Sequence, residues 1–135
     1  MSGAPIQAWL ESVLAQAQAR AGSVHEERDG DLHLVPSHAI PEPVLERIRH
    51  VARGKGMAGL AQVQRQPVQT CNLQTDDTGR IRPMARMVGG GAAVGIPVFR
   101  ADGSLQAVVG FSFEEEGELP ADRVRALEAL ARTLP

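Results

Sequence analysis

The stretch AAVGIPVFRADGSLQAVVGFSF, residues 92–113, decides the fold class of this chain. It holds two almost continuous apolar runs, residues 92–99 and 105–113, on either side of an Asp-Gly pair. Asp-Gly between two apolar runs predicts a tight hairpin, because its turn residues must tolerate positive φ angles. Runs that are apolar at nearly every position indicate central strands, covered on both faces of a sheet. Four of their side chains should therefore be buried in paired strands: Val94, Ile96, Val108 and Phe111.

Both ends of the chain show the pattern of a helix with one apolar face. In residues 5–20 and in residues 120–134, apolar side chains recur at helical spacing. Pro5 suits the first turn of a helix, where its missing N–H group removes no hydrogen bond. We expect the two terminal helices to pack together on one face of the sheet. Their apolar positions are Ile6, Leu10, Val13, Leu14 and Ala17 in the first helix, and Val124, Leu127, Leu130 and Leu134 in the last.

Shorter segments between these parts predict further strands and another helix. The pair Asp29-Gly30 predicts a second hairpin, whose polar first strand indicates a solvent-exposed edge. The order of the elements predicts an α+β fold with a mostly antiparallel sheet. The expected elements are strands at 23–28, 32–35 and 68–73, a helix at 41–53, a helix or a strand at 58–66, a polar loop at 74–79 and one or two helical turns at 83–88.

Length and composition limit the class of protein. The 135 residues, 43% hydrophobic and 22% charged, fit one globular domain over residues 1–135. A net charge of −2 argues against nucleic-acid binding through bulk positive charge, and an aromatic content of 3% disfavours stacking of bases. No apolar run is long enough to span a bilayer, and the N-terminus lacks the features of a signal peptide. We therefore expect a cytoplasmic protein without a membrane or nucleic-acid partner.

Four local motifs, taken in order, resemble those of the GAF domain family. They are the glycine-rich segment 54–61, the pair Pro67-Val68, the small-residue strand that ends in Pro97-Val98, and the segment 102–110. Their order and spacing along most of the chain carry the resemblance. It implies a six-stranded antiparallel sheet with the N- and C-terminal helices packed on one face. It also implies a ligand pocket on the other face, covered by a loop.

The segment GKGMAGLA, residues 54–61, also matches the Gly-x-Gly-x-x-Gly pattern of dinucleotide-binding proteins. That pattern needs a strand before the glycines within a parallel βαβ unit, whereas a helix is expected before these glycines. We therefore disfavour a nicotinamide cofactor and expect no cofactor of any kind. In the structural interpretation, Gly54 and Gly56 adopt positive φ angles after a helix, and Gly59 permits close packing.

Three arginines, at positions 80, 82 and 86, follow the polar loop, where the resemblance places the cover of the pocket. Guanidinium groups bind carboxylates and phosphates through paired hydrogen bonds, so the expected ligand is a small anionic metabolite. The alternative is a solvated loop in which the arginines neutralise Asp76 and Asp77. The candidate ligand-binding residues are Cys71, Asn72, Asp76, Arg82 and Arg86.

The sequence contains no recognisable catalytic or metal-binding motif. The histidines at positions 25, 33, 38 and 50 lack the spacing of a metal site, and no nucleophile elbow or phosphate-binding loop is present. The Asn-Lys-x-x-Phe-Asp-Glu signature of the family's cyclic-nucleotide branch is absent. The family's free methionine sulfoxide reductases use several cysteines, whereas this chain has only Cys71, which we interpret as a small buried side chain.

These observations predict a non-catalytic sensory or regulatory module that binds a small molecule, a signalling partner, or both. One alternative is a dimeric scaffold without a ligand, in which the terminal helices of two copies pair. A lesser alternative is an enzyme that resembles the free methionine sulfoxide reductases. The acidic run at 114–116 is either solvated or a docking patch for a basic partner. The candidate interface residues are Trp9, Leu10, Leu14, Val124 and Leu127, although the aliphatic ones could instead fill the core.

Overall fold

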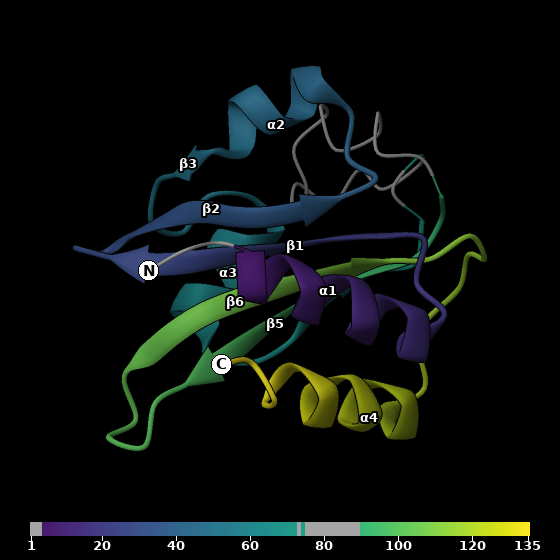
Figure 1. The fold of residues 1–135 in the computed structure, drawn as a ribbon. Coiled ribbons are helices and arrows are strands. Elements are labelled where there is room, and N and C mark those ends of the chain that lie inside the picture. Colours follow the sequence, from purple (N-terminus) through teal and green to yellow (C-terminus); the bar gives the residue numbers. More distant parts are fainter. Residues whose placement is uncertain (1–3, 73, 75–89) are drawn as a thin grey trace.

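The computed structural model describes residues 4–72, 74 and 90–135, which form four helices and a six-stranded sheet (Figure 1). The helices are α1 Ala4–Ala17, α2 Glu42–Ile48, α3 Gly56–Gln64 and α4 Ala121–Ala131. The strands are β1 Ala21–Arg28, β2 Asp31–His38, β3 His50–Val51, β4 Val68–Thr70, β5 Ala93–Phe99 and β6 Leu105–Ser112. The loop expected at 74–79 and the helical turns expected at 83–88 lie outside the described residues, apart from residue 74.

The strands pair in the order β3-β2-β1-β6-β5-β4, and every neighbouring pair is antiparallel. β5 and β6 form the predicted hairpin, whose turn is closed by the Arg100 N–H donating to the Ser104 carbonyl at 2.8 Å. Both strands have neighbours on either side, which confirms their predicted central position. The four side chains expected in the core are all buried: Val94, Ile96, Val108 and Phe111.

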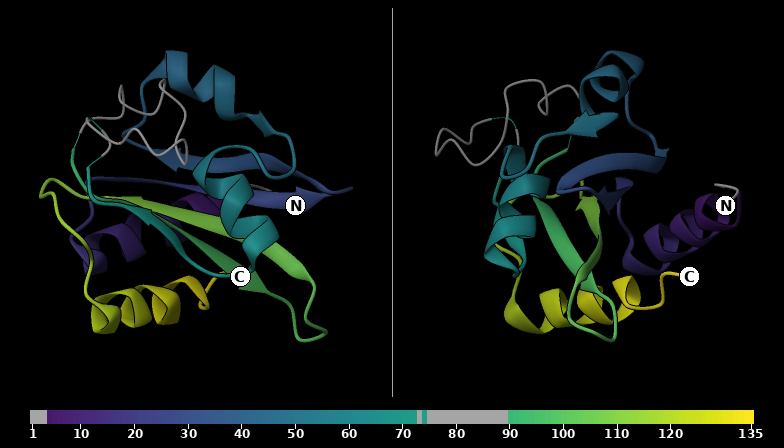
Figure 2. Two further views of the ribbon diagram at one scale, coloured as in Figure 1. Left: turned by 180° about the vertical axis from the view of Figure 1, so that it is seen from behind. Right: turned by 90° about the vertical axis from the view of Figure 1, so that its left-hand side faces the viewer.

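The sheet separates two layers of helices (Figure 2). α1 and α4 contact each other and cover one face, here called the terminal-helix face, as predicted. α3 covers β4, β5 and β6 on the opposite face, with α2 beside β3, and we call this the α2/α3 face. The core is divided in the same way into two clusters. The larger, around Leu10 and Phe111, lies on the terminal-helix face, and the smaller, around Leu32 and Val108, lies on the α2/α3 face. The α+β fold implied by the resemblance is therefore confirmed.

Helix α2 is shorter than the predicted helix at 41–53, because it ends at Ile48 and strand β3 follows. The last carbonyl groups of α2 find partners outside the helix. His25 Nε2 donates to the Ile48 carbonyl at 2.8 Å, and the Leu34 N–H donates to the Arg49 carbonyl at 2.9 Å. The next two residues then pair with β2. Tertiary hydrogen bonding thus ends a helix that the local apolar pattern would continue.

Strand β1 is central, although its polar sequence indicated a solvent edge. It pairs with β2 on one side and with β6 on the other. His25 is buried and Glu26 is half-buried, while Arg28 at the end of the strand is exposed. The edge prediction is wrong because a polar strand can be central when its buried polar group has a partner, and the Ile48 carbonyl provides one for His25.

The glycine-rich segment 54–61 leads into α3 and forms its first turns. The element at 58–66, for which the sequence allowed a helix or a strand, is therefore a helix. Gly54 and Gly56 have φ angles of 79° and 63°, as the structural interpretation predicted. A Cβ atom at Gly59 would lie 2.7 Å from the Gly54 carbonyl carbon, which confirms the close packing. Since all strand pairs in the sheet are antiparallel, the segment does not belong to a dinucleotide-binding βαβ unit.

Candidate functional site

Of the five predicted ligand-binding residues, three lie outside the described residues: Asp76, Arg82 and Arg86. The structure does describe Cys71, which follows the last residue of β4 and whose side chain is exposed. The interpretation of Cys71 as a small buried side chain is therefore wrong. The strand ends at Thr70, so the thiol lies beyond the packed interior of the sheet. The Cys71 carbonyl accepts a hydrogen bond from the Gly117 N–H at 2.9 Å.

Asn72, the next predicted ligand-binding residue, connects the end of β4 to the segment before α4. Its Nδ2 donates to Glu116 Oε2 at 2.5 Å, and its Oδ1 accepts a hydrogen bond from the Gln74 N–H at 2.8 Å. Both polar groups of this side chain thus have partners within the chain. These bonds give Asn72 a structural role at the point where the chain leaves the sheet.

The acidic run before α4 also has partners in the same chain. Arg20 forms an ion pair with Glu114, and Arg123 donates to Glu115 at 3.3 Å. The next carboxylate, Glu116, accepts the amide hydrogen bond described above. A basic partner that docked on this run would have to displace these groups. The run is therefore exposed and paired within its own chain, and docking of a basic partner on it stays a hypothesis.

On the α2/α3 face, where the resemblance implied the ligand pocket, His25 of β1 is a buried titratable group. Its neighbours in the register are Leu34 of β2 and Val108 of β6. Because a carbonyl oxygen only accepts, the ring nitrogen Nε2 carries the proton that it donates to Ile48. Burial lowers the pKa of His25 below its ordinary value of 6.5, outweighing the hydrogen bond to Ile48, which raises it. The neutral ring therefore links the sheet to the end of α2 at pH 7.

The lowered pKa of His25 predicts that the domain loses stability as the pH falls. Below pH 6.5 the histidine of the unfolded chain takes up a proton that the buried ring resists, so acid favours the unfolded state. Between about pH 7.5 and pH 5.5, this group should lower the free energy of unfolding by an amount on the order of 1 kcal/mol. Urea denaturation at the two pH values measures the loss. His25→Gln should remove this part of the loss, whereas His38→Gln, at an exposed position, should keep it; an equal loss in both variants would contradict the assignment.

A second polar cluster lies at the sheet edge formed by β2 and β3. His50 Nε2 is hydrogen-bonded to Asp31 Oδ2 at 2.7 Å, and the rings of His33 and His50 are 5.0 Å apart. The hydrogen bond with His50, and then that from the Arg53 N–H, lower the pKa of the Asp31 carboxyl below its ordinary value. Within the ranges that the structure describes, no group of three or more histidine, cysteine or acidic side chains could hold a metal ion. The cluster thus attaches the short strand β3 to β2.

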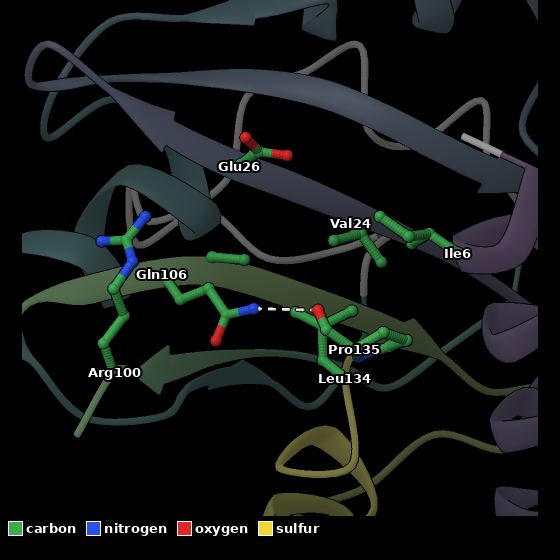
Figure 3. Close-up of a pocket in the computed structure, with 8 residues that line it drawn as sticks. Ile6, Val24, Glu26, Arg100, Gln106, Leu134 and Pro135 are labelled. Atoms are coloured by element: carbon green, nitrogen blue, oxygen red, sulfur yellow. Dashed lines mark hydrogen bonds between the residues drawn. The ribbon is translucent and has the colours of Figure 1, made fainter. Parts of the chain in front are cut away.

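A pocket of about 140 Å³ lies on the terminal-helix face, beside β1, β6 and the end of α4 (Figure 3). Its polar residues are Glu26, Arg100 and Gln106, and its other lining residues are Ile6, Val24, Ala107, Leu134 and Pro135. The sequence offered no signal for this pocket, because its polar residues share no motif and come from separate segments. Its face is opposite to the one that the resemblance implied for a ligand.

The predicted interface residues connect α1 and α4 within one copy of the chain. Three of the five are buried in its core: Leu10, Leu14 and Leu127. Val124 is partly buried against the same cluster. Trp9 also packs there, and its Nε1 donates to Thr133 Oγ1 at 2.8 Å. These contacts fill the core of the single chain, and the pairing of two copies through the helices stays a prediction.

Residues 5–134 of the chain match the protein family described as GAF domain. No curated protein matches the sequence. Among solved structures, the chain is similar to a type II free methionine-R-sulfoxide reductase from Thermoplasma acidophilum, at 11% identity and a TM-score of 0.75, over 97% of this chain and 87% of the other. It is similar to the GAF domain of a phosphoenolpyruvate-protein phosphotransferase from Coxiella burnetii, at 17% identity and a TM-score of 0.75, over 98% and 76% of the two chains.

A third similar structure is a GAF domain/HD domain protein from Geobacter sulfurreducens, at 12% identity and a TM-score of 0.76, over 98% and 88% of the two chains. Identities this low establish a shared fold and leave activity open. In the described part of the chain, no helix combines the length and the apolar character needed to cross a membrane. Because the family match extends over nearly the whole sequence and the fold agrees with it, this chain belongs to the GAF domain family.

Proposed function

We propose that this GAF domain is a non-catalytic sensory module that binds a small molecule and signals to a partner protein. The observation that carries the proposal is the thiol content of the chain. Cys71 is the only cysteine among 135 residues, and it is exposed beyond the end of β4. A thiol-based reductase attacks with one cysteine and forms a disulfide with a second, which this chain cannot supply by itself. Membership of the GAF domain family and the single thiol together support the binding of a small molecule without its chemical conversion.

We place the proposed ligand on the α2/α3 face of the sheet. The buried, neutral His25 contributes a rigid polar group to that face, since its ring is hydrogen-bonded to the end of α2. Arg82 and Arg86 supply the positive charge that a small carboxylate or phosphate requires, because guanidinium groups bind such anions through paired hydrogen bonds. A small anionic metabolite is therefore the proposed ligand class.

Thermal unfolding in the presence of small metabolic carboxylates and phosphates tests this proposal. At least one compound should raise the melting temperature of the wild-type chain, because a ligand that binds only the folded state stabilises it. The double variant Arg82→Ala and Arg86→Ala should lose that rise, with its own stability changed by less than about 0.5 kcal/mol. The matched control is the double variant Arg47→Ala and Arg125→Ala, at exposed positions of α2 and α4, which should keep the rise.

Three results would contradict parts of the proposal in different ways. A ligand effect that survives the first double variant would place the site elsewhere. Reduction of free methionine sulfoxide by a thiol reductant, abolished by Cys71→Ser, would show an enzyme instead of a sensor. Absence of any ligand effect, together with a dimer in sedimentation velocity, would favour the scaffold without a ligand.

A further inference from the structure

The pocket of Figure 3 has the size of a site for a very small ligand, and its lining combines apolar and polar side chains. Ile6 of α1, Val24 of β1 and Leu134 beyond α4 form much of its apolar lining. Its volume of about 140 Å³ is close to the roughly 150 Å³ of an engineered apolar cavity that binds benzene. The pocket therefore fits a compound of about six to eight non-hydrogen atoms.

The wall beyond α4 is held in place by hydrogen bonds between three elements. Trp9 Nε1 of α1 donates to Thr133 Oγ1 at 2.8 Å, and the Thr133 hydroxyl donates to the Leu130 carbonyl at 2.6 Å. From β6, Gln106 Nε2 donates to the main-chain oxygen of Pro135 at 3.2 Å. Leu134 lies between these fixed points, so this side of the pocket is formed before any ligand binds, which lowers the entropic cost of binding.

Two opposite charges line the pocket without pairing with each other. Arg100 Nη1 donates to the Leu105 carbonyl at 2.7 Å and to Ser104 Oγ at 3.3 Å, whereas its Nη2 and Nε have no acceptor among the described residues. Nor does any residue in the described ranges form a hydrogen bond or ion pair with the Glu26 carboxylate. Glu26 is half-buried on a central strand, so water screens its charge less than it screens a fully exposed carboxylate.

We propose that this pocket binds a small zwitterion of the α-amino acid class with a short apolar side chain. The ammonium group of the ligand pairs with Glu26, its carboxylate pairs with Arg100, and its side chain packs against Ile6, Val24 and Leu134. A simple anion or a simple cation would pair with only one of the two charged side chains of the pocket, although Asp102 in the hairpin turn offsets part of the charge of Arg100. The site is separate from the one proposed above for an anion, because the sheet lies between the two faces.

Methyl and amide NMR of the full chain, titrated with L-valine, tests the proposal. The methyl signals of Ile6, Val24 and Leu134 should shift and saturate below about 10 mM, as for a dissociation constant near 1 mM or tighter. Isovalerate and isobutylamine, which are valine without its ammonium group and without its carboxylate, respectively, should bind at least about tenfold more weakly. Glu26→Gln and Arg100→Gln should each weaken valine binding by about tenfold or more.

The control variants Glu46→Gln and Arg47→Gln change exposed residues of α2 and should leave valine binding unchanged. The proposal is overturned if valine shifts none of the three methyl signals. It is equally overturned if the shifts concentrate around His25 and Val108 on the other face, or if isovalerate binds as tightly as valine. Loss of a ligand effect in the thermal experiment above does not bear on this site, since the arginine pair changed there is a different one.

Discussion

Replacement of Phe111 by alanine should lower the free energy of unfolding by about 3–5 kcal/mol. Phe111 lies in β6 between Val94 of β5 and Gly22 of β1, and only 1% of its surface is exposed. Removing the ring forfeits its burial and leaves a cavity under α1 and α4, which close-packed neighbours fill only in part. Since a domain of this kind is stable by about 5–15 kcal/mol in total, the variant should lose a large share of its stability.

Urea denaturation followed by the fluorescence of Trp9 measures this loss, because Trp9 is the single tryptophan, packs against the larger core cluster and is hydrogen-bonded to Thr133 just beyond α4. Val108→Ala, on the other face of β6, should cost about 1–2 kcal/mol through a smaller cavity. Val63→Ala is the matched surface control on α3 and should change stability by less than about 0.5 kcal/mol. A loss for Phe111→Ala no larger than that of the surface control would contradict the central position of β6.

Gly59→Ala should destabilise the domain by about 1–3 kcal/mol. In the interior of an ordinary helix, the same substitution stabilises by about 0.5–1 kcal/mol, since alanine loses less backbone entropy than glycine. Here the new Cβ atom would lie 2.7 Å from the Gly54 carbonyl carbon and 3.0 Å from the Gly54 nitrogen. These are backbone atoms of a turn, so relief of the clash must move α3 or the segment that leads into it. The sign of the effect is therefore opposite to the one that helix propensity predicts.

The same urea assay, with Ala58→Gly as control, separates the contact from helix propensity. Ala58 is the adjacent residue of α3 and packs partly against the smaller core cluster, so its replacement should cost about 1 kcal/mol through helix propensity and the loss of one methyl group. If Gly59→Ala were more stable than the wild type, the close approach of α3 to Gly54 would be refuted.

Much of the fold could be predicted from the sequence, because its strongest patterns are local and apolar. Three features each depend on residues within one short segment: the hairpin of β5 and β6, the terminal helices, and the positive φ angles of the glycines where α3 begins. The errors arose where distant groups decide the structure. A hydrogen bond from His25 of β1 satisfies the last carbonyl of α2, and the same bond gives a partner to the buried ring of a central strand. No periodicity within either segment reveals that pairing.

The candidate site was less accessible from the sequence, for a related reason. Cys71 and Asn72 were expected beside a ligand, yet the structure shows an exposed thiol and an amide bonded to Glu116. Glu26 and Arg100 both line the pocket on the terminal-helix face. The pairing of β1 with β6 and the turn between β5 and β6 bring these two residues to the same side of the sheet. A charged residue in a strand carries no sign of which face it lies on until the neighbouring strands are known.

The strand order also determines the course of folding. The β1–β2 and β5–β6 pairs join strands that are neighbours in sequence, so each closes only a short loop. The β1–β6 pair, by contrast, brings Val24 beside Val109 and closes most of the chain into a single loop. Loop closure loses more entropy as the loop lengthens, and contacts between distant residues slow folding. We therefore expect the union of the two hairpins to be the slow step of folding, since neither hairpin has a complete core until the two ends of the chain have met.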